Sequence, residues 1–91
     1  GNLVRNGIGA RGGVPWTQPA THGIYIDDQT EDVRIAGNSV LNVEGHGIFL
    51  HNTRGVRIDG NTVVDAGQAQ VFYDDSASGG FQVTATTVRD N

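Results

Sequence analysis

The chain has 91 residues, a net charge of -4 and 14 glycines, and it contains no cysteine and no methionine. Its length allows one domain, the missing cysteines exclude disulfides and thiolate metal sites, and the acidic balance with scattered arginines argues against a nucleic-acid partner. No apolar run is long enough to cross a bilayer, so we expect no membrane partner. Valine, isoleucine, threonine and asparagine accompany the glycines, which favours short strands and tight turns over helices.

The first 21 residues divide into the end of a repeat and a loop. Residues 1–6, GNLVRN, match the later strings GNSVLN and GNTVVD, so they form the remnant of a coil. Residues 7–21 have no counterpart later in the chain, and their many glycines and two prolines exclude a regular helix. We predict an inserted loop that projects from the repeat, and loops of this length usually carry function.

Copies of a repeat of 23 to 24 residues fill the remainder. Residues 22–45 open with His-Gly-Ile-Tyr-Ile and residues 46–68 with His-Gly-Ile-Phe-Leu, and each copy continues with Val-Arg-Ile and a Gly-Asn pair. The third copy, residues 69–91, is weaker, and in our alignment Ala85 and Thr86 replace its Gly-Asn pair. We expect residues 1–91 to form a single segment of a longer chain, in contact with flanking coils of that chain.

Within each copy, apolar and polar residues alternate over three short runs, which predicts three half-buried strands per copy. Such copies stack about 4.8 Å apart with parallel pairing, so the sequence predicts an all-β parallel β-helix of about three coils. Asn2, Asn38 and Asn61 fall at one sharp turn, where stacked amides can bond along the axis. This pattern resembles the asparagine ladder of right-handed parallel β-helix proteins, the pectin-lyase-like superfamily. The resemblance implies a right-handed coil and a secreted, periplasmic or cell-surface location.

Strand alternation also predicts which side chains of the first strand in each coil face outward. An aromatic column comprises Tyr25, Phe49 and Phe72. An ionisable column comprises Asp27, His51 and Asp74. Two more aspartates, Asp28 and Asp75, begin the turn that follows.

The ionisable column is our candidate catalytic set. The two carboxyls of Asp27 and Asp74 stand two coils apart, about 9 to 10 Å between backbones, which suits an inverting glycosidase better than a retaining one. Between them, His51 could orient water or a sugar hydroxyl. We include Asp28 and Asp75 as catalytic candidates, although turn capping explains aspartates at strand ends equally well.

We expect the aromatic column to bind the substrate, a polysaccharide or oligosaccharide, with help from the inserted loop. The residues of this predicted binding set are Tyr25, Phe49, Phe72, Trp16 and Arg11. A stack of rings that only stabilises the wall is the alternative. We expect no metal and no cofactor for a hydrolase.

The Asp-Asp pair at 27–28 and the Gly-His-Gly string at 45–47 resemble motifs of polygalacturonase-like β-helix hydrolases. Here, however, His46 recurs at the position that His22 occupies one coil earlier, which favours a stacking role for both histidines.

Two other functions stay open. A polysaccharide lyase would hold Ca²⁺ with its carboxylates and needs a base near the substrate, but the sequence has no lysine. A non-catalytic β-helix could serve as a carbohydrate-binding or structural rod, as in an adhesin, a tailspike or a periplasmic binding protein. A long insertion beside an acidic column favours the glycoside hydrolase.

Overall fold

A computed structural model of the chain describes residues 1–9, 21–76 and 82–91. The described residues form strands in three parallel sheets and no helix. One sheet comprises β1 (Leu3–Gly7), β4 (Ser39–Val43) and β7 (Thr62–Ala66). The second comprises β2 (Ile24–Ile26), β5 (Ile48–His51) and β8 (Val71–Asp74). The third comprises β3 (Arg34–Ala36), β6 (Arg57–Asp59) and β9 (Thr87–Arg89).

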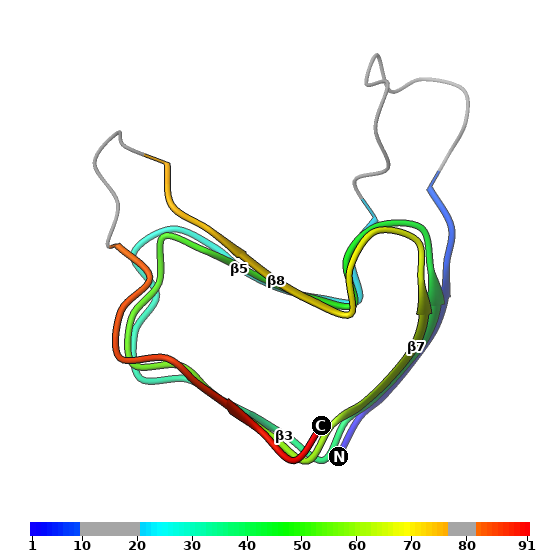
Figure 1. Cartoon of the computed structure of the whole chain (residues 1–91). Coiled ribbons are helices and arrows are strands. Elements are labelled where there is room, and N and C mark those ends of the chain that lie inside the picture. Colours follow the sequence, from blue (N-terminus) through cyan, green and yellow to red (C-terminus); the bar gives the residue numbers. More distant parts are fainter. Residues whose placement is uncertain (10–20, 77–81) are drawn as a thin grey trace.

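The chain winds through the three sheets in turn and rises by one coil each time (Figure 1). The first coil contains β2, β3 and β4, the second β5, β6 and β7, and the third β8 and β9. Equivalent residues pair directly, as Ile24 does with Ile48 and Ile48 with Val71. The predicted parallel β-helix with three strands per coil is therefore confirmed.

Inward-facing aliphatic side chains fill the coil. Ile48, Leu50 and Ile58 of the second coil are fully buried, because a coil covers them on each side. Burying such a side chain contributes about 1.5 to 3 kcal/mol. Tyr73 lies in the same inward column as Leu50, but in the third coil 64% of it is exposed. Stability therefore depends on stacking coil upon coil.

The asparagine ladder is present at the corner after the third sheet's strands. The Asn38 amide donates to Asn61 Oδ1 at 2.9 Å, and the Asn61 amide donates to Asn91 Oδ1 at 2.9 Å. Asn2 extends the ladder at its other end by donating to Asn38 Oδ1 at 3.0 Å. The amides thus satisfy one another along the axis while the backbone turns sharply.

Our alignment of the third copy was wrong. Asn91, not Thr86, continues the ladder, and Asp90 takes a positive φ of 53° as Gly60 does at 57°. The third coil is longer than the others: the side chain of Asn52 bonds to Ser76, whereas Arg54 pairs with Thr84. Thus Arg54 follows Asn52 by two residues in the second coil, whereas the equivalent Thr84 follows Ser76 by eight in the third. A second insertion lies between Ser76 and Thr84, and because of it Asn91 follows Asn61 by 30 residues, whereas Asn61 follows Asn38 by 23.

Of the inserted loop predicted at residues 7–21, Gly7 belongs to β1 and pairs with Val43, and residues 10–20 lie outside the described part. Its described flanks meet the turn after β4: the Gly9 N–H donates to Glu44 Oε2 at 3.0 Å, and the Gly45 N–H donates to the Thr21 carbonyl at 2.8 Å. Within the described ranges, no helix has the length and hydrophobicity that crossing a membrane requires.

Candidate functional site

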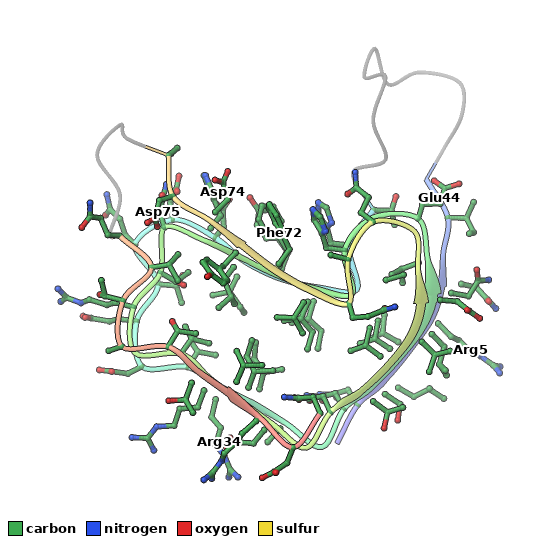
Figure 2. All side chains as sticks on the ribbon, in the orientation of Figure 1. Arg5, Arg34, Glu44, Phe72, Asp74 and Asp75 are labelled. Atoms are coloured by element: carbon green, nitrogen blue, oxygen red, sulfur yellow. The ribbon has the colours of Figure 1, made fainter. Side chains whose placement is uncertain are left out.

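The outer surface of the sheet β2–β5–β8, named here the acidic face, carries the predicted columns. Tyr25 pairs with Phe49 and Phe49 with Phe72, and His51 pairs with Asp74, as strand alternation predicted. Figure 2 shows Phe72 and Asp74 projecting outward from β8, on the side of the coil opposite Arg34. The structure thus brings together residues that lie about fifty positions apart in the sequence.

Asp27, Asp28 and His51 form a close cluster on this face. The His51 Nδ1 lies 3.0 Å from Asp27 Oδ1 and 3.1 Å from Asp28 Oδ1. Because an ionised carboxylate only accepts, the tautomer with a proton on Nδ1 lets His51 donate to these oxygens. The Tyr25 hydroxyl donates to Asp27 Oδ1 at 3.1 Å.

These donors favour the ionised form of Asp27. The backbone N–H of Asp28, then the His51 ring and, more weakly, the Tyr25 hydroxyl hold the pKa of the Asp27 carboxyl below its usual range, although desolvation acts in the opposite direction. Asp27 is therefore a carboxylate at neutral pH. Its side chain is 58% exposed, so a substrate can reach it.

Asp74 stands next to His51 on the other side, in the third coil. Within the described ranges, no hydrogen bond or ion pair of its side chain is found. Its carboxyl is exposed and free to meet a ligand. The backbones of residues two coils apart are separated by about 9 to 10 Å, which leaves room for water or a sugar between Asp27 and Asp74.

Asp28 and Asp75 have partners that fit turn capping. Asn52, only 2% exposed, donates to Asp28 Oδ1 at 2.7 Å and to Ser76 Oγ at 2.9 Å. These bonds form a second polar ladder at the turn that follows β2, β5 and β8. Asp75 Oδ1 accepts from the Val83 N–H at 2.5 Å and so joins the two described flanks of the second insertion. The geometry gives both aspartates a structural task, and their catalytic role stays a prediction.

The aromatic rings stack on one another. Tyr25 and Phe49 are nearly parallel, with centroids 4.7 Å apart and planes 2° apart, and Phe72 stacks on His46 at 4.3 Å and 7°. A stacked ring shows its edge, not its face, to the solvent. This arrangement fits the wall-stabilising alternative, and a sugar would meet ring edges and the outer surfaces of Tyr25 and Phe72, which are 46% and 39% exposed.

His22 and His46 belong to the same stack, with ring centroids 5.2 Å apart and planes 8° apart. The His46 N–H donates to His22 Nδ1 at 2.9 Å. Burial lowers the pKa of both rings, and in His22 the neighbouring His46 lowers it further. Both are neutral at pH 7, which agrees with the stacking role that their recurrence predicted.

One group on this face could hold a metal ion. Asp27, Asp28 and His51 offer ligand atoms that all lie within 4.8 Å of one another. A nitrogen ligand beside two carboxylates suits manganese, iron or zinc better than Ca²⁺, which prefers oxygen ligands only. Tyr25 and Asn52, which donate to the two carboxylates, would orient them for such an ion.

Two residues of the predicted binding set, Trp16 and Arg11, lie outside the described residues. Conversely, the sequence analysis missed Asn52 and Asn91. Asn91 had a signal, since it is an asparagine behind an apolar strand like Asn38 and Asn61. Asn52 had only a weak one, because its equivalents are Asp28 and Ser76 and the three share nothing but small polar side chains.

A coil of three parallel sheets with an asparagine ladder and an ionisable outer face defines a β-helix solenoid. The family model described as "Right handed beta helix region" matches residues 2–91, and the chain belongs to this family. Searches among curated proteins and among solved structures found no significant match.

Proposed function

We propose that the chain is the catalytic part of a glycoside hydrolase that cleaves a polysaccharide on the acidic face. The observation that carries the proposal is the position of His51: its Nδ1 lies 3.0 Å from Asp27, and its backbone is in register with Asp74. Two carboxyls in different surroundings are the elements that acid–base cleavage of a glycosidic bond requires, and a histidine between them can orient water or a sugar hydroxyl.

Asp27 is the general base in this proposal. Its lowered pKa keeps it ionised, and His51 and Tyr25 fix its carboxylate from one side. Asp27 would take a proton from a water molecule as that water attacks the anomeric carbon, while Asp74, in its protonated form, would give its proton to the departing glycosidic oxygen. The separation of two coils supports inversion of configuration, because water must fit between base and sugar.

The lyase alternative loses support. The nitrogen of His51 is a poor ligand for Ca²⁺, and none of the described arginines belongs to β2, β5 or β8, where a lyase would need a cationic partner for its substrate's carboxylates. A rod that only binds carbohydrate stays a competing outcome of the test below. With a polymeric substrate, we propose that the protein acts outside the cytoplasm.

The test is release of new reducing ends from a panel of polysaccharides, measured together with binding. We expect Asp27→Asn and Asp74→Asn each to lower turnover by about a hundredfold or more. Asp65→Asn is the matched control, because it removes a carboxylate at a β7 position whose counterpart in β4 is Asn42, with φ of 57° and 55°. Binding without cleavage would favour the rod, and products that absorb near 235 nm would favour a lyase.

A further inference from the structure

An open hollow of about 290 Å³ lies on the outside of the coil, at the corner before the sheet β3–β6–β9. Its lining residues are Asp32, Val33, Arg34, Gly55 and Arg57. Figure 2 shows Arg34 on the side of the coil opposite Phe72 and Asp74, so the hollow is separate from the acidic face. A Cβ at Gly55 would come within 2.6 Å of Asp32 Oδ1, so only glycine leaves room for that carboxylate. A hollow of this size suits a small molecule.

Two arginines of this hollow stand side by side in neighbouring coils. Arg34 of β3 pairs in register with Arg57 of β6, and both residues are exposed. Like charges directly opposite each other on adjacent strands are unfavourable, so each needs a counter-charge. Arg34 has one, because its Nε donates to Asp59 Oδ2 at 3.2 Å. The other oxygen of that carboxylate accepts from Arg89 Nε at 2.9 Å, so Asp59 is occupied by these two arginines.

The guanidinium of Arg57 has no counter-charge in the described part of the chain. No hydrogen bond or ion pair of its side chain is found there, whereas its backbone N–H donates to the Val33 carbonyl at 2.9 Å. A guanidinium presents a planar fork of N–H donors that matches a carboxylate or a phosphate. Arg57 therefore offers the hollow an anion-binding fork on a backbone that the neighbouring coil holds in place.

The acidic groups around the hollow decide what kind of anion fits. Asp32 lines the hollow, and Asp59 lies beside it against Arg34. Because one positive charge, on Arg57, is left to balance, a second negative charge on the ligand would be repelled by the two carboxylates. A carboxylate carries one charge, whereas a phosphate monoester carries nearly two. An exposed aspartate at neutral pH only accepts hydrogen bonds, so Asp32 would bind a ligand that also carries a donor such as a hydroxyl.

We propose that this hollow is a binding site for a hydroxycarboxylate, a small organic acid that bears a hydroxyl beside its carboxylate. The carboxylate of the ligand lies on the fork of Arg57, and its hydroxyl donates to Asp32. The site does not depend on the proposed hydrolase, because it lies outside the sheet β2–β5–β8 and uses none of the candidate catalytic residues.

Three matched anions test the proposal by NMR titration, followed through the backbone amide signals of Gly55 and Arg57. Glycolate has both the carboxylate and the hydroxyl, and acetate lacks the hydroxyl. Methyl phosphate at pH about 7.5 carries mostly two charges, because the second pKa of such esters is about 6. We expect glycolate to bind with a Kd of about 1 to 10 mM and acetate about threefold to tenfold more weakly, since acetate lacks one hydrogen bond. Methyl phosphate should also bind more weakly than glycolate.

Matched variants separate the fork from a general attraction for anions. Arg57→Gln should weaken glycolate binding about tenfold or more. Arg57→Lys should weaken it several-fold although the charge is kept, because an ammonium group has no planar fork. Arg5→Gln is the control, since it removes an exposed arginine from β1 on another sheet and should leave binding unchanged. Asp32→Gly, which suits the φ of 58° at this position, should abolish the preference for glycolate over acetate.

Several results would overturn the proposal. These are acetate or methyl phosphate binding as tightly as glycolate, unchanged glycolate binding in Arg57→Gln or Arg57→Lys, or no shift of the Gly55 and Arg57 signals at tens of millimolar glycolate. The proposed function is judged separately: absence of reducing ends from every polysaccharide would refute the hydrolase, while a measured preference for glycolate at this hollow would still stand.

Discussion

The asparagine ladder makes a quantitative prediction about stability. The Asn61 side chain is 2% exposed and takes part in four hydrogen bonds of 2.9 Å. Its amide donates to the Ile35 carbonyl and to Asn91 Oδ1, and its Oδ1 accepts from the backbone N–H and the amide of Asn38. Replacing Asn61 by alanine leaves the buried N–H and side-chain amide of Asn38 without their acceptor and removes one bond to the Ile35 carbonyl.

The magnitude follows from the number of groups left unpaired. Each buried donor or acceptor without a partner costs about 1 to 3 kcal/mol, so we expect Asn61→Ala to lower the free energy of unfolding by about 3 to 5 kcal/mol. A domain of this size has a total stability of about 5 to 14 kcal/mol. The substitution should therefore remove a large part of the stability of the chain.

Asn2→Ala is the matched control, because Asn2 is exposed and its side chain makes one ladder bond, to Asn38 at 3.0 Å. We expect it to cost about 0.5 to 1.5 kcal/mol. The assay is urea denaturation followed by circular dichroism. If Asn61→Ala shifted the midpoint no more than Asn2→Ala does, the ladder would not contribute as its geometry indicates.

Three further predictions concern the acidic face and its stack. Because the pKa values of His22 and His46 are lowered in the folded state, the two histidines bind protons more readily in the unfolded chain. Their contribution to the free energy of unfolding should therefore be fully present above the unfolded pKa of about 6.5 and be lost as the pH falls through the folded pKa values. His46→Phe should flatten this acid limb of the urea midpoint, and an unchanged limb would argue against the histidines as its cause. The Tyr25 phenol should titrate near pH 12 by NMR, and Asp27→Asn should lower that value because it removes a negative charge next to the hydroxyl; an equal pKa in both proteins would contradict the contact. Mn²⁺ should broaden the NMR signals of Asp27 and His51 selectively, and an equal concentration of Ca²⁺ should not reverse the broadening; reversal by Ca²⁺ would argue against His51 as a ligand.

The second insertion illustrates a limit of repeat analysis. The Gly-Asn pair of the earlier copies has two possible counterparts in the third copy. The residues around Ala85 and Thr86 resemble a degenerate turn at the expected repeat position, and Ala85 itself has a positive φ of 52°. Only the pairing of β6 with β9, Ile58 with Val88, shows which turn belongs to the ladder. Pairing between coils is a tertiary property, because nothing within residues 82–91 fixes their register on the coil below.

Sequence alone was enough to predict the coil and, in its first two copies, the three strands and the direction of their residues, since alternation is a local property of extended backbone. It therefore placed Asp27, His51 and Asp74 in one outward column, as the register of β5 with β8 bears out for the last two. Tertiary structure alone decided how these side chains meet: that His51 turns its Nδ1 to both Asp27 and Asp28, and that the aromatic rings show edges instead of faces. Side-chain contacts across coils depend on rotamers, and rotamers are chosen by the packing of neighbours that the chain brings together only when it folds.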